Sequence, residues 1–198
     1  LFGRLNLNSI SVGCFSKGGG GAQLLAKIDS SLKAVISLYP FIENPVALDF
    51  VHNIPTLIVS GQLDIIAPPT LHADLHYDFI PSSTSKLKFE VALGSHDALL
   101  GPSGANGEVG ERVLSWLAYF MLNDNCYCPL ITILPVFSSQ YIFNINCNSL
   151  SNNNISDVNE SNIESIFDLF GRKTYFKSNQ LLFYRYSDGN VSKKIVLE

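Results

Sequence analysis

The sequence predicts an α/β layer fold followed by a small all-β unit. Short apolar runs rich in Val and Ile alternate along the chain with segments whose apolar residues recur at helical spacing. The runs at residues 33–38 and 56–60 are short, apolar and rich in Val and Ile, which is typical of parallel strands covered on both faces. Beyond residue 163 only β-like segments remain.

The elements of the layer fold are predicted in order from these patterns. Residues 9–14 alternate small polar and apolar side chains, so a strand is expected there, stopping at residues 15–18. Leu24, Leu25 and Ile28 then lie at helical spacing, which predicts a helix over residues 19–28. The remaining patterns predict strands at 33–38, 56–60 and 86–93, and helices at 70–80 and 107–122.

The composition excludes several classes of protein. The 198 residues are 46% hydrophobic and 15% charged, a mixture that can bury a core and is not that of a disordered chain. The formal net charge of −4 leaves no basic face for a phosphate backbone, so nucleic-acid binding is disfavoured. No run reaches the roughly 18 apolar residues that a membrane-spanning helix needs.

Ser16 is the candidate nucleophile, because it stands between the first predicted strand and the first predicted helix. This setting is typical of a nucleophile elbow, whose sharp turn lifts the hydroxyl clear of the sheet. Such a turn requires small residues two positions before and after the serine; Gly18 fits, and Cys14 is still small. A structural turn and a phosphate-binding loop are the alternatives, although the Lys-Ser/Thr ending of a P-loop is missing.

Asp64 and His96 are the candidate partners of Ser16. Each follows a predicted strand, where loops leave the carboxyl end of a parallel sheet and where sites of open α/β sheets form. An imidazole suits proton transfer near neutral pH, and a carboxylate can orient it. The order Ser16, Asp64, His96 is the chain order of the α/β-hydrolase triad. Each residue also has a simpler interpretation, Asp64 as the start of a turn and His96 as a surface histidine.

The other three histidines are weaker candidates. His72 and His76 are four residues apart on a predicted helix, but no third metal ligand stands at a suitable spacing. They are interpreted as surface or helix-packing residues, and His52 has no evident partner. No metal and no cofactor are expected.

With these residues in place, the stretch from about Arg4 to Cys147 resembles the secreted bacterial polyester hydrolase and cutinase family, a dienelactone-hydrolase-like branch that includes poly(ethylene terephthalate) hydrolases. The resemblance is carried by four segments, residues 16–21, 55–58 with 64–68, 81–83, and 94–96. It implies an α/β-hydrolase fold with Ser16 as nucleophile, Asp64 as acid and His96 as base. It also implies the Lys17 backbone amide as an oxyanion donor.

Three positions depart from the family pattern and bear on the substrate. Cys14 stands where the family usually has glycine, and Lys17 stands where a methionine commonly lines the acyl subsite. Phe41 occupies the position of a tryptophan that stacks on an aromatic acyl group in this family. The resemblance therefore implies Phe41 and Lys17 as substrate-binding residues; the alternative for Phe41 is a core aromatic.

The cysteines favour an oxidising compartment, since Cys126, Cys128 and Cys147 cluster. The segment from Trp116 to Pro129 resembles the closing helix and first half-cystine of the family's C-terminal disulfide. The resemblance implies a bridge from Cys128 to Cys147. By closing this loop, the bridge would stabilise the folded state by about 3 kcal/mol. Cys126 is the competing partner or a spare thiol.

The C-terminal part is predicted to be a separate unit. An Asn- and Ser-rich connector is expected over residues 149–162, with a boundary near Leu150, between a catalytic part at 1–148 and a β-rich part at 163–198. Strands are expected at 165–170, 179–186 and 191–197, and Asp188-Gly189 predicts a hairpin. This tail resembles a type IX secretion sorting domain of Bacteroidetes; the alternative is a small accessory β-module.

These observations predict a secreted or cell-surface serine carboxylester hydrolase. The partners expected are an ester or polyester substrate and the type IX secretion machinery. The alternatives are a noncatalytic surface protein that retains the scaffold and a lipase or lactone hydrolase of the same fold. In the α/β-hydrolase fold the elbow follows the fifth strand, so the first four strands and one oxyanion donor are expected before Leu1. Residues 1–198 alone are therefore expected to be nearly inactive.

Overall fold

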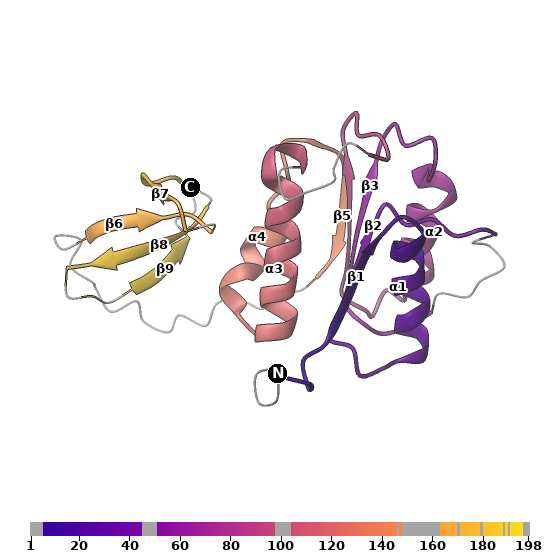
Figure 1. Cartoon of the computed structure of the whole chain (residues 1–198), viewed down its shortest axis with the longest axis horizontal. Coiled ribbons are helices and arrows are strands. Elements are labelled where there is room, and N and C mark those ends of the chain that lie inside the picture. Colours follow the sequence, from indigo (N-terminus) through magenta and orange to yellow (C-terminus); the bar gives the residue numbers. More distant parts are fainter. Residues whose placement is uncertain are drawn as a thin grey trace.

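The computed structural model describes residues 6–44, 51–97, 104–145, 147, 163–169, 171–178, 180–187, 189 and 191–195. A five-stranded sheet of order β1-β2-β3-β4-β5 forms the centre of the first part (Figure 1). Four strands run parallel and the fifth is antiparallel. The strands are β1 (Ser11–Phe15), β2 (Ala34–Leu38), β3 (Thr56–Gly61), β4 (Lys86–Val91) and β5 (Ser138–Asn144).

Helices cover both faces of this sheet (Figure 1). One face carries α1 (Lys17–Ile28) and α2 (Ala73–Phe79), and the other carries α3 (Glu108–Leu122) and α4 (Cys128–Thr132). Short 3-10 turns lie at Pro69–Leu71, Gly104–Gly107 and Asn125–Tyr127. A mainly parallel sheet between two helical layers is the predicted α/β-hydrolase arrangement.

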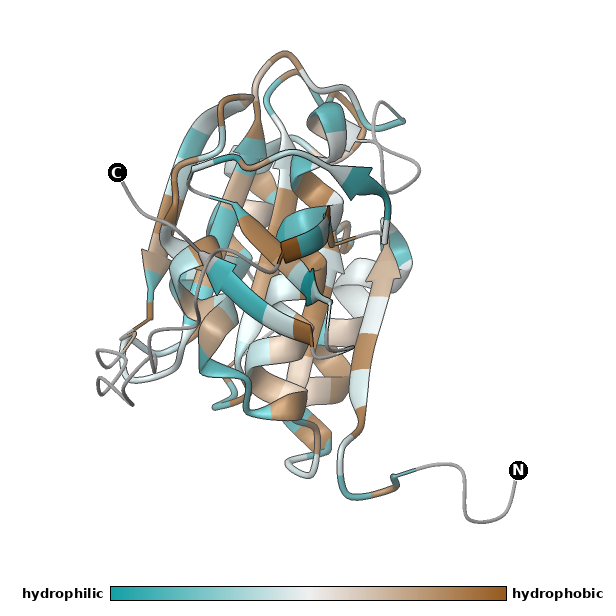
Figure 2. Cartoon of the chain, turned by 90° about the vertical axis from the view of Figure 1, so that its left-hand side faces the viewer, coloured by the Kyte–Doolittle hydropathy of each residue, from teal (hydrophilic) through white to brown (hydrophobic). Residues whose placement is uncertain are grey.

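The core lies on both faces of the central strands. Figure 2 shows hydrophobic residues running along these strands between the helices. All six residues of β3 are buried, which explains why its centre is apolar and why its polar residues are small. Trp116 of α3 packs with Phe89 on one face, whereas Ala22 of α1 packs with Val35 on the other.

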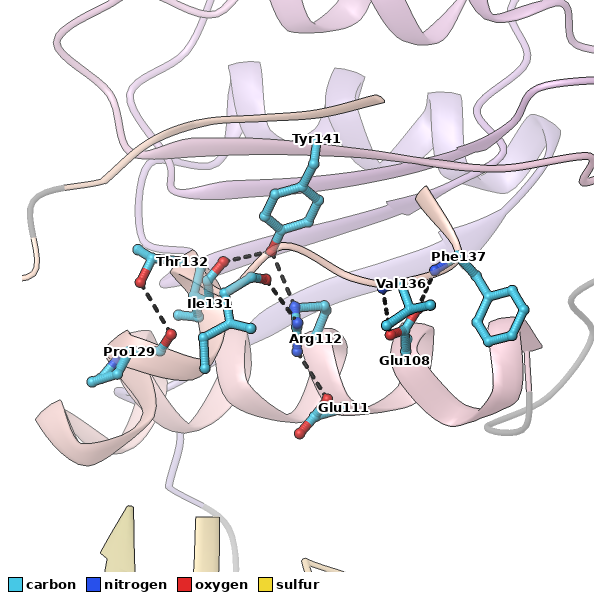
Figure 3. A network of polar contacts seen from close by, with 10 residues as sticks. Glu108, Glu111, Arg112, Pro129, Ile131, Thr132, Val136, Phe137 and Tyr141 are labelled. Atoms are coloured by element: carbon cyan, nitrogen blue, oxygen red, sulfur yellow. Dashed lines mark hydrogen bonds and ion pairs between the residues drawn. The ribbon is translucent and has the colours of Figure 1, made fainter. Parts of the chain in front are cut away.

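The fifth strand is a finding that the sequence patterns did not predict. Figure 3 shows how the neighbouring helix holds it in place. Arg112 of α3 is buried and donates hydrogen bonds to the Tyr141 hydroxyl of β5 at 3.1 Å and to the Ile133 carbonyl oxygen at 2.9 Å. The Glu108 carboxylate accepts bonds from the backbone N–H groups of Val136 and Phe137, so α3 anchors the loop that leads into β5.

The helix predicted over residues 70–80 is divided in the structure. A 3-10 turn at Pro69–Leu71 is followed by His72 with φ −131° and ψ −77°, and α2 begins only at Ala73. His72 leaves helical geometry where its side chain turns toward Phe41 and Ile42. The other predicted elements match observed ones to within a few residues.

A second, antiparallel sheet of order β7-β6-β8-β9 forms the C-terminal part. Its strands are β6 (Ile163–Phe167), β7 (Lys173–Thr174), β8 (Leu181–Tyr186) and β9 (Val191–Ile195). The predicted hairpin joins β8 to β9, whose paired residues include Arg185 and Val191. The predicted connector and its boundary near Leu150 lie outside the described residues. Within the described residues no helix is long and apolar enough to cross a bilayer.

Candidate active site

Four loops meet at the carboxyl edge of the parallel strands. Ser16 follows β1 directly, Phe41 lies three residues beyond the end of β2, and Asp64 and His96 follow β3 and β4. Because β1 to β4 run parallel, their carboxyl ends share one edge of the sheet. The topology therefore gathers side chains that are up to 80 residues apart in the sequence.

The turn at Ser16 has the strained backbone of a nucleophile elbow. Ser16 adopts φ 54° and ψ −123°, an unusual conformation for a residue with a side chain. Backbone hydrogen bonds fix this conformation, since the Ser16 N–H donates to the Leu38 carbonyl oxygen at 2.8 Å and the Phe41 N–H donates to the Ser16 carbonyl oxygen at 3.0 Å. The strain is thus held by β2 and by the loop that follows it.

The glycines after Ser16 let the chain pack closely around this turn. A Cβ atom at Gly18 would lie 2.2 Å from the Cys14 sulfur, and one at Gly20 would lie 2.5 Å from the Phe41 carbonyl oxygen. At Gly21 a Cβ atom would meet nothing within 4 Å. Cys14 is therefore accommodated because Gly18 has no side chain, and Gly21 has no steric role.

Ser16, His96 and Asp64 form a continuous hydrogen-bonded chain. The Ser16 hydroxyl oxygen lies 2.9 Å from His96 Nε2, and His96 Nδ1 lies 2.6 Å from Asp64 Oδ2. A carboxylate can only accept, so His96 Nδ1 carries the proton and Nε2 is free to accept from the hydroxyl. This is the arrangement in which an imidazole can take a proton from the serine.

The Asp64 carboxylate is held rigidly and is shielded from water. Its second oxygen accepts hydrogen bonds from the backbone N–H groups of Ile66 at 2.9 Å and Ala67 at 2.8 Å. The side chain is fully buried, and that of His96 is nearly so. Three donors therefore compensate the buried charge of Asp64 and fix the direction in which it faces His96.

Two aromatic residues frame the imidazole of His96. The Phe15 ring centroid lies 4.9 Å from that of His96, and the Tyr39 ring meets His96 edge-on at 5.9 Å. Burial and the nearby Asp64 charge raise the pKa of Tyr39, whose hydroxyl has no hydrogen-bond partner among the described residues. Tyr39 also has a positive φ of 47°. No pattern in the sequence singles out Phe15 or Tyr39.

The rim of the site is formed by Phe41 and its neighbours. The Phe41 ring is half-buried and stacks on His72 with centroids 4.8 Å apart. The Lys17 ammonium lies 5.8 Å from the Phe41 ring centroid and 3.7 Å from the Glu43 carboxylate. Phe41 is therefore neither a core aromatic nor a free surface one.

The remaining histidines are buried, which corrects part of the sequence interpretation. His72 and His76 are not surface residues; His72 supports Phe41, and His76 is fully buried in α2, where burial lowers its pKa to about 3. His52 does have a partner, because its Nε2 lies 2.9 Å from the Gln23 amide oxygen. Among the described residues, no group of three or more His, Cys, Asp or Glu side chains could hold a metal ion.

A disulfide joins Cys128 of α4 to Cys147, with Cα atoms 5.6 Å apart. Cys126 has a free thiol, and so does Cys14, which is exposed on β1. The bridge closes the segment that contains β5, so it fastens the antiparallel edge strand to the helical layer.

The fold and the site together define a chain of the α/β-hydrolase type, with a serine, a histidine and an aspartate in contact at the strand ends. The chain belongs to the PET hydrolase-like family, whose model matches residues 1–146. It is 36% identical over 130 residues to cutinase est1 of Thermobifida alba, an alignment that covers 64% of this chain and 42% of that protein.

Two further relatives give the same result. Cutinase 1 of Thermobifida cellulosilytica is 36% identical over 130 residues, with 64% of this chain and 48% of that protein covered. Bis(hydroxyethyl) terephthalate hydrolase of Streptomyces coelicolor is 33% identical over 132 residues, with 65% of this chain and 41% of that protein covered. The chain thus spans less than half the length of these curated relatives.

Proposed function

We propose that the protein is a serine carboxylester hydrolase that acts on polyesters of the cutin or terephthalate type. The observation that carries the proposal is the hydrogen-bonded chain from Ser16 through His96 to Asp64 at the strand ends. Membership of the PET hydrolase-like family supports it, as do relatives named cutinase and bis(hydroxyethyl) terephthalate hydrolase. The proposed reaction needs no metal and no cofactor.

In the proposed mechanism, Ser16 attacks the ester carbonyl carbon while His96 Nε2 takes the hydroxyl proton. The C–O bond of the ester then breaks, and His96 returns the proton to the leaving alcohol. Water, activated by the same imidazole, hydrolyses the acyl-enzyme and releases the acid. Asp64 keeps the imidazole in the required tautomer and stabilises its positive charge.

The oxyanion is assigned to the start of α1. Lys17 is the first residue of this helix, and the N–H groups of a first helical turn have no intrahelical acceptor. The Lys17 N–H can therefore donate to the tetrahedral oxyanion, assisted by the positive end of the helix dipole. The rim residue Phe41 is proposed to contact the acyl group, because its ring lies beside Lys17 and His72 at the same edge of the sheet.

The test uses the protein produced from its complete gene. A fluorophosphonate probe should label Ser16, and the Ser16→Ala variant should lose both the label and at least about 10³-fold of kcat on p-nitrophenyl butyrate and on a polyester film. A folded, unlabelled and inactive wild type would overturn the proposal in favour of a noncatalytic surface protein. Turnover of lipids or lactones without polyester turnover would instead overturn the substrate assignment.

We further propose that the protein is secreted and that residues 163–198 act as a type IX sorting address, separated from the catalytic part at 1–148 by the connector at 149–162. The antiparallel sheet of β6 to β9 and the disulfide between Cys128 and Cys147 are consistent with this. Deletion of residues 163–198 in a type IX-secreting host should leave the protein in the periplasm. Unchanged export of the truncated protein would refute the sorting role.

A further inference from the structure

The mouth of the site carries a charge that follows directly from the sequence after the nucleophile. Lys17 stands next to Ser16, at the first position of α1, and its side chain is 78% exposed. Its ammonium group lies over the Phe41 ring, 5.8 Å from the centroid. The residue that follows Ser16 thus places a cation at the rim of the site.

The positive charge of Lys17 is only loosely compensated. Among the residues that the structure describes, Lys17 forms an ion pair with Glu43 at 3.7 Å, and that side chain is 80% exposed. Exposed ion pairs of this kind contribute little to stability, because water competes with both groups. The Asp64 carboxylate is buried and already engaged by His96 and two backbone N–H groups.

The first turn of α1 adds to this positive character. It contains no acidic residue, so the positive end of the helix dipole is not neutralised within the helix. An anionic group bound against the Phe41 ring would meet the Lys17 ammonium at little cost, since displacing Glu43 into water loses only a weak contact. A neutral group bound at the same place would not form an ion pair with Lys17, so displacing Glu43 would not strengthen its binding.

We propose that Lys17 makes the site selective for esters whose acyl part carries a second, ionised carboxylate, that is, for anionic half-esters of dicarboxylic acids. Glu43 is the counter-ion that such a substrate displaces. The inference rests on the proposed esterase function and deepens it. It assigns the site to the short anionic fragments that polyester cleavage releases, in addition to the neutral polymer itself.

The experiment compares two substrates of nearly equal shape, methyl 4-carboxybenzoate and its neutral amide analogue methyl 4-carbamoylbenzoate, with the protein from the complete gene. The readout is the ratio of their kcat/KM values, so that the neutral ester serves as the internal reference within each variant. Lys17→Met should lower the anionic-to-neutral ratio about three- to fivefold. Lys17→Glu should lower it further, because it places a like charge at the rim.

Two further measurements separate charge from shape. Glu43→Gln should raise the ratio about twofold, because it removes the competing carboxylate and leaves the lysine in place. Salt at 0.5 M should shrink the wild-type ratio toward that of Lys17→Met, since exposed charges are screened. A ratio that is unchanged in Lys17→Met and insensitive to salt would overturn the inference while hydrolysis persists. Absence of hydrolysis of either ester and of labelling at Ser16 would overturn the proposed function instead.

Discussion

Two buried histidines at opposite ends of the parallel strands differ in the partners that they contact. His96, beyond the carboxyl end of β4, and His52, before the amino end of β3, have the same exposed fraction, 6%. His96 donates to the Asp64 carboxylate and faces the Ser16 hydroxyl. His52 contacts the Gln23 amide oxygen and accepts from the Ile54 backbone N–H.

The difference lies in the partners and not in the burial. The Ile54 N–H donates to His52 Nδ1, which fixes the proton on Nε2, where it binds the neutral Gln23 amide. A second proton on His52 would have no carboxylate to stabilise it, and burial lowers its pKa to about 4. His96 has such a carboxylate, so it can accept a proton from Ser16 during a reaction.

The largest expected effect comes from removing the charge next to His96. Asp64→Asn keeps the shape of the side chain but allows its amide to donate to Nδ1, which favours the wrong imidazole tautomer. We expect kcat for p-nitrophenyl butyrate to fall about 10³- to 10⁴-fold with little change in KM. Steady-state kinetics on the protein from the complete gene measures both constants.

The matched control removes the partner of the other histidine. Gln23→Ala deletes the amide that His52 contacts, and we expect kcat to stay within about threefold of the wild type at a temperature where both variants are folded. If Asp64→Asn retained most of the wild-type kcat, the assigned role of Asp64 would be wrong. A comparable loss in both variants would indicate that α1 packing, and not the carboxylate, controls the site.

The three central residues of the site could be selected from the sequence because each has a local signal. Ser16 stands between a strand and a glycine-rich helix start, Asp64 stands in a loop after an apolar strand, and His96 stands in a loop after the strand predicted at 86–93. A parallel sheet brings all such loops to one edge, so the fold class alone predicts that these residues are neighbours.

The residues that surround the site have no such signal. The sequence contains several aromatic residues and histidines, and nothing in it distinguishes Tyr39 or His72 from the others. Only tertiary packing brings Tyr39 to His96 and His72 to Phe41. Strand β5 escaped prediction for a related reason. The consecutive apolar residues Tyr141, Ile142 and Phe143 do not show the two-residue alternation expected of an edge strand. The hydrogen bond that holds Tyr141 comes from Arg112, which lies 29 residues earlier in the sequence.

A smaller effect is expected at His52, and its sign follows from the direction of the pKa shift. Above about pH 6.5 the imidazole is neutral in both the folded and the unfolded chain, so protonation of His52 takes nothing from the free energy of unfolding. Between pH 6.5 and about 4 only the unfolded chain takes up the proton, and stability is lost as the pH falls. We expect this one group to cost about 1–2 kcal/mol of the free energy of unfolding at pH 5.

Urea denaturation of wild type and His52→Gln at pH 7.5 and pH 5 isolates this contribution. The variant is expected to be less stable at pH 7.5, because it loses contacts of His52, but to lose about 1–2 kcal/mol less than the wild type on acidification. His76, whose pKa burial also lowers, is present in both proteins and cancels from the comparison. Equal acid losses in the two proteins would show that His52 can be protonated in the folded state, and the contrast with His96 would then rest on position alone.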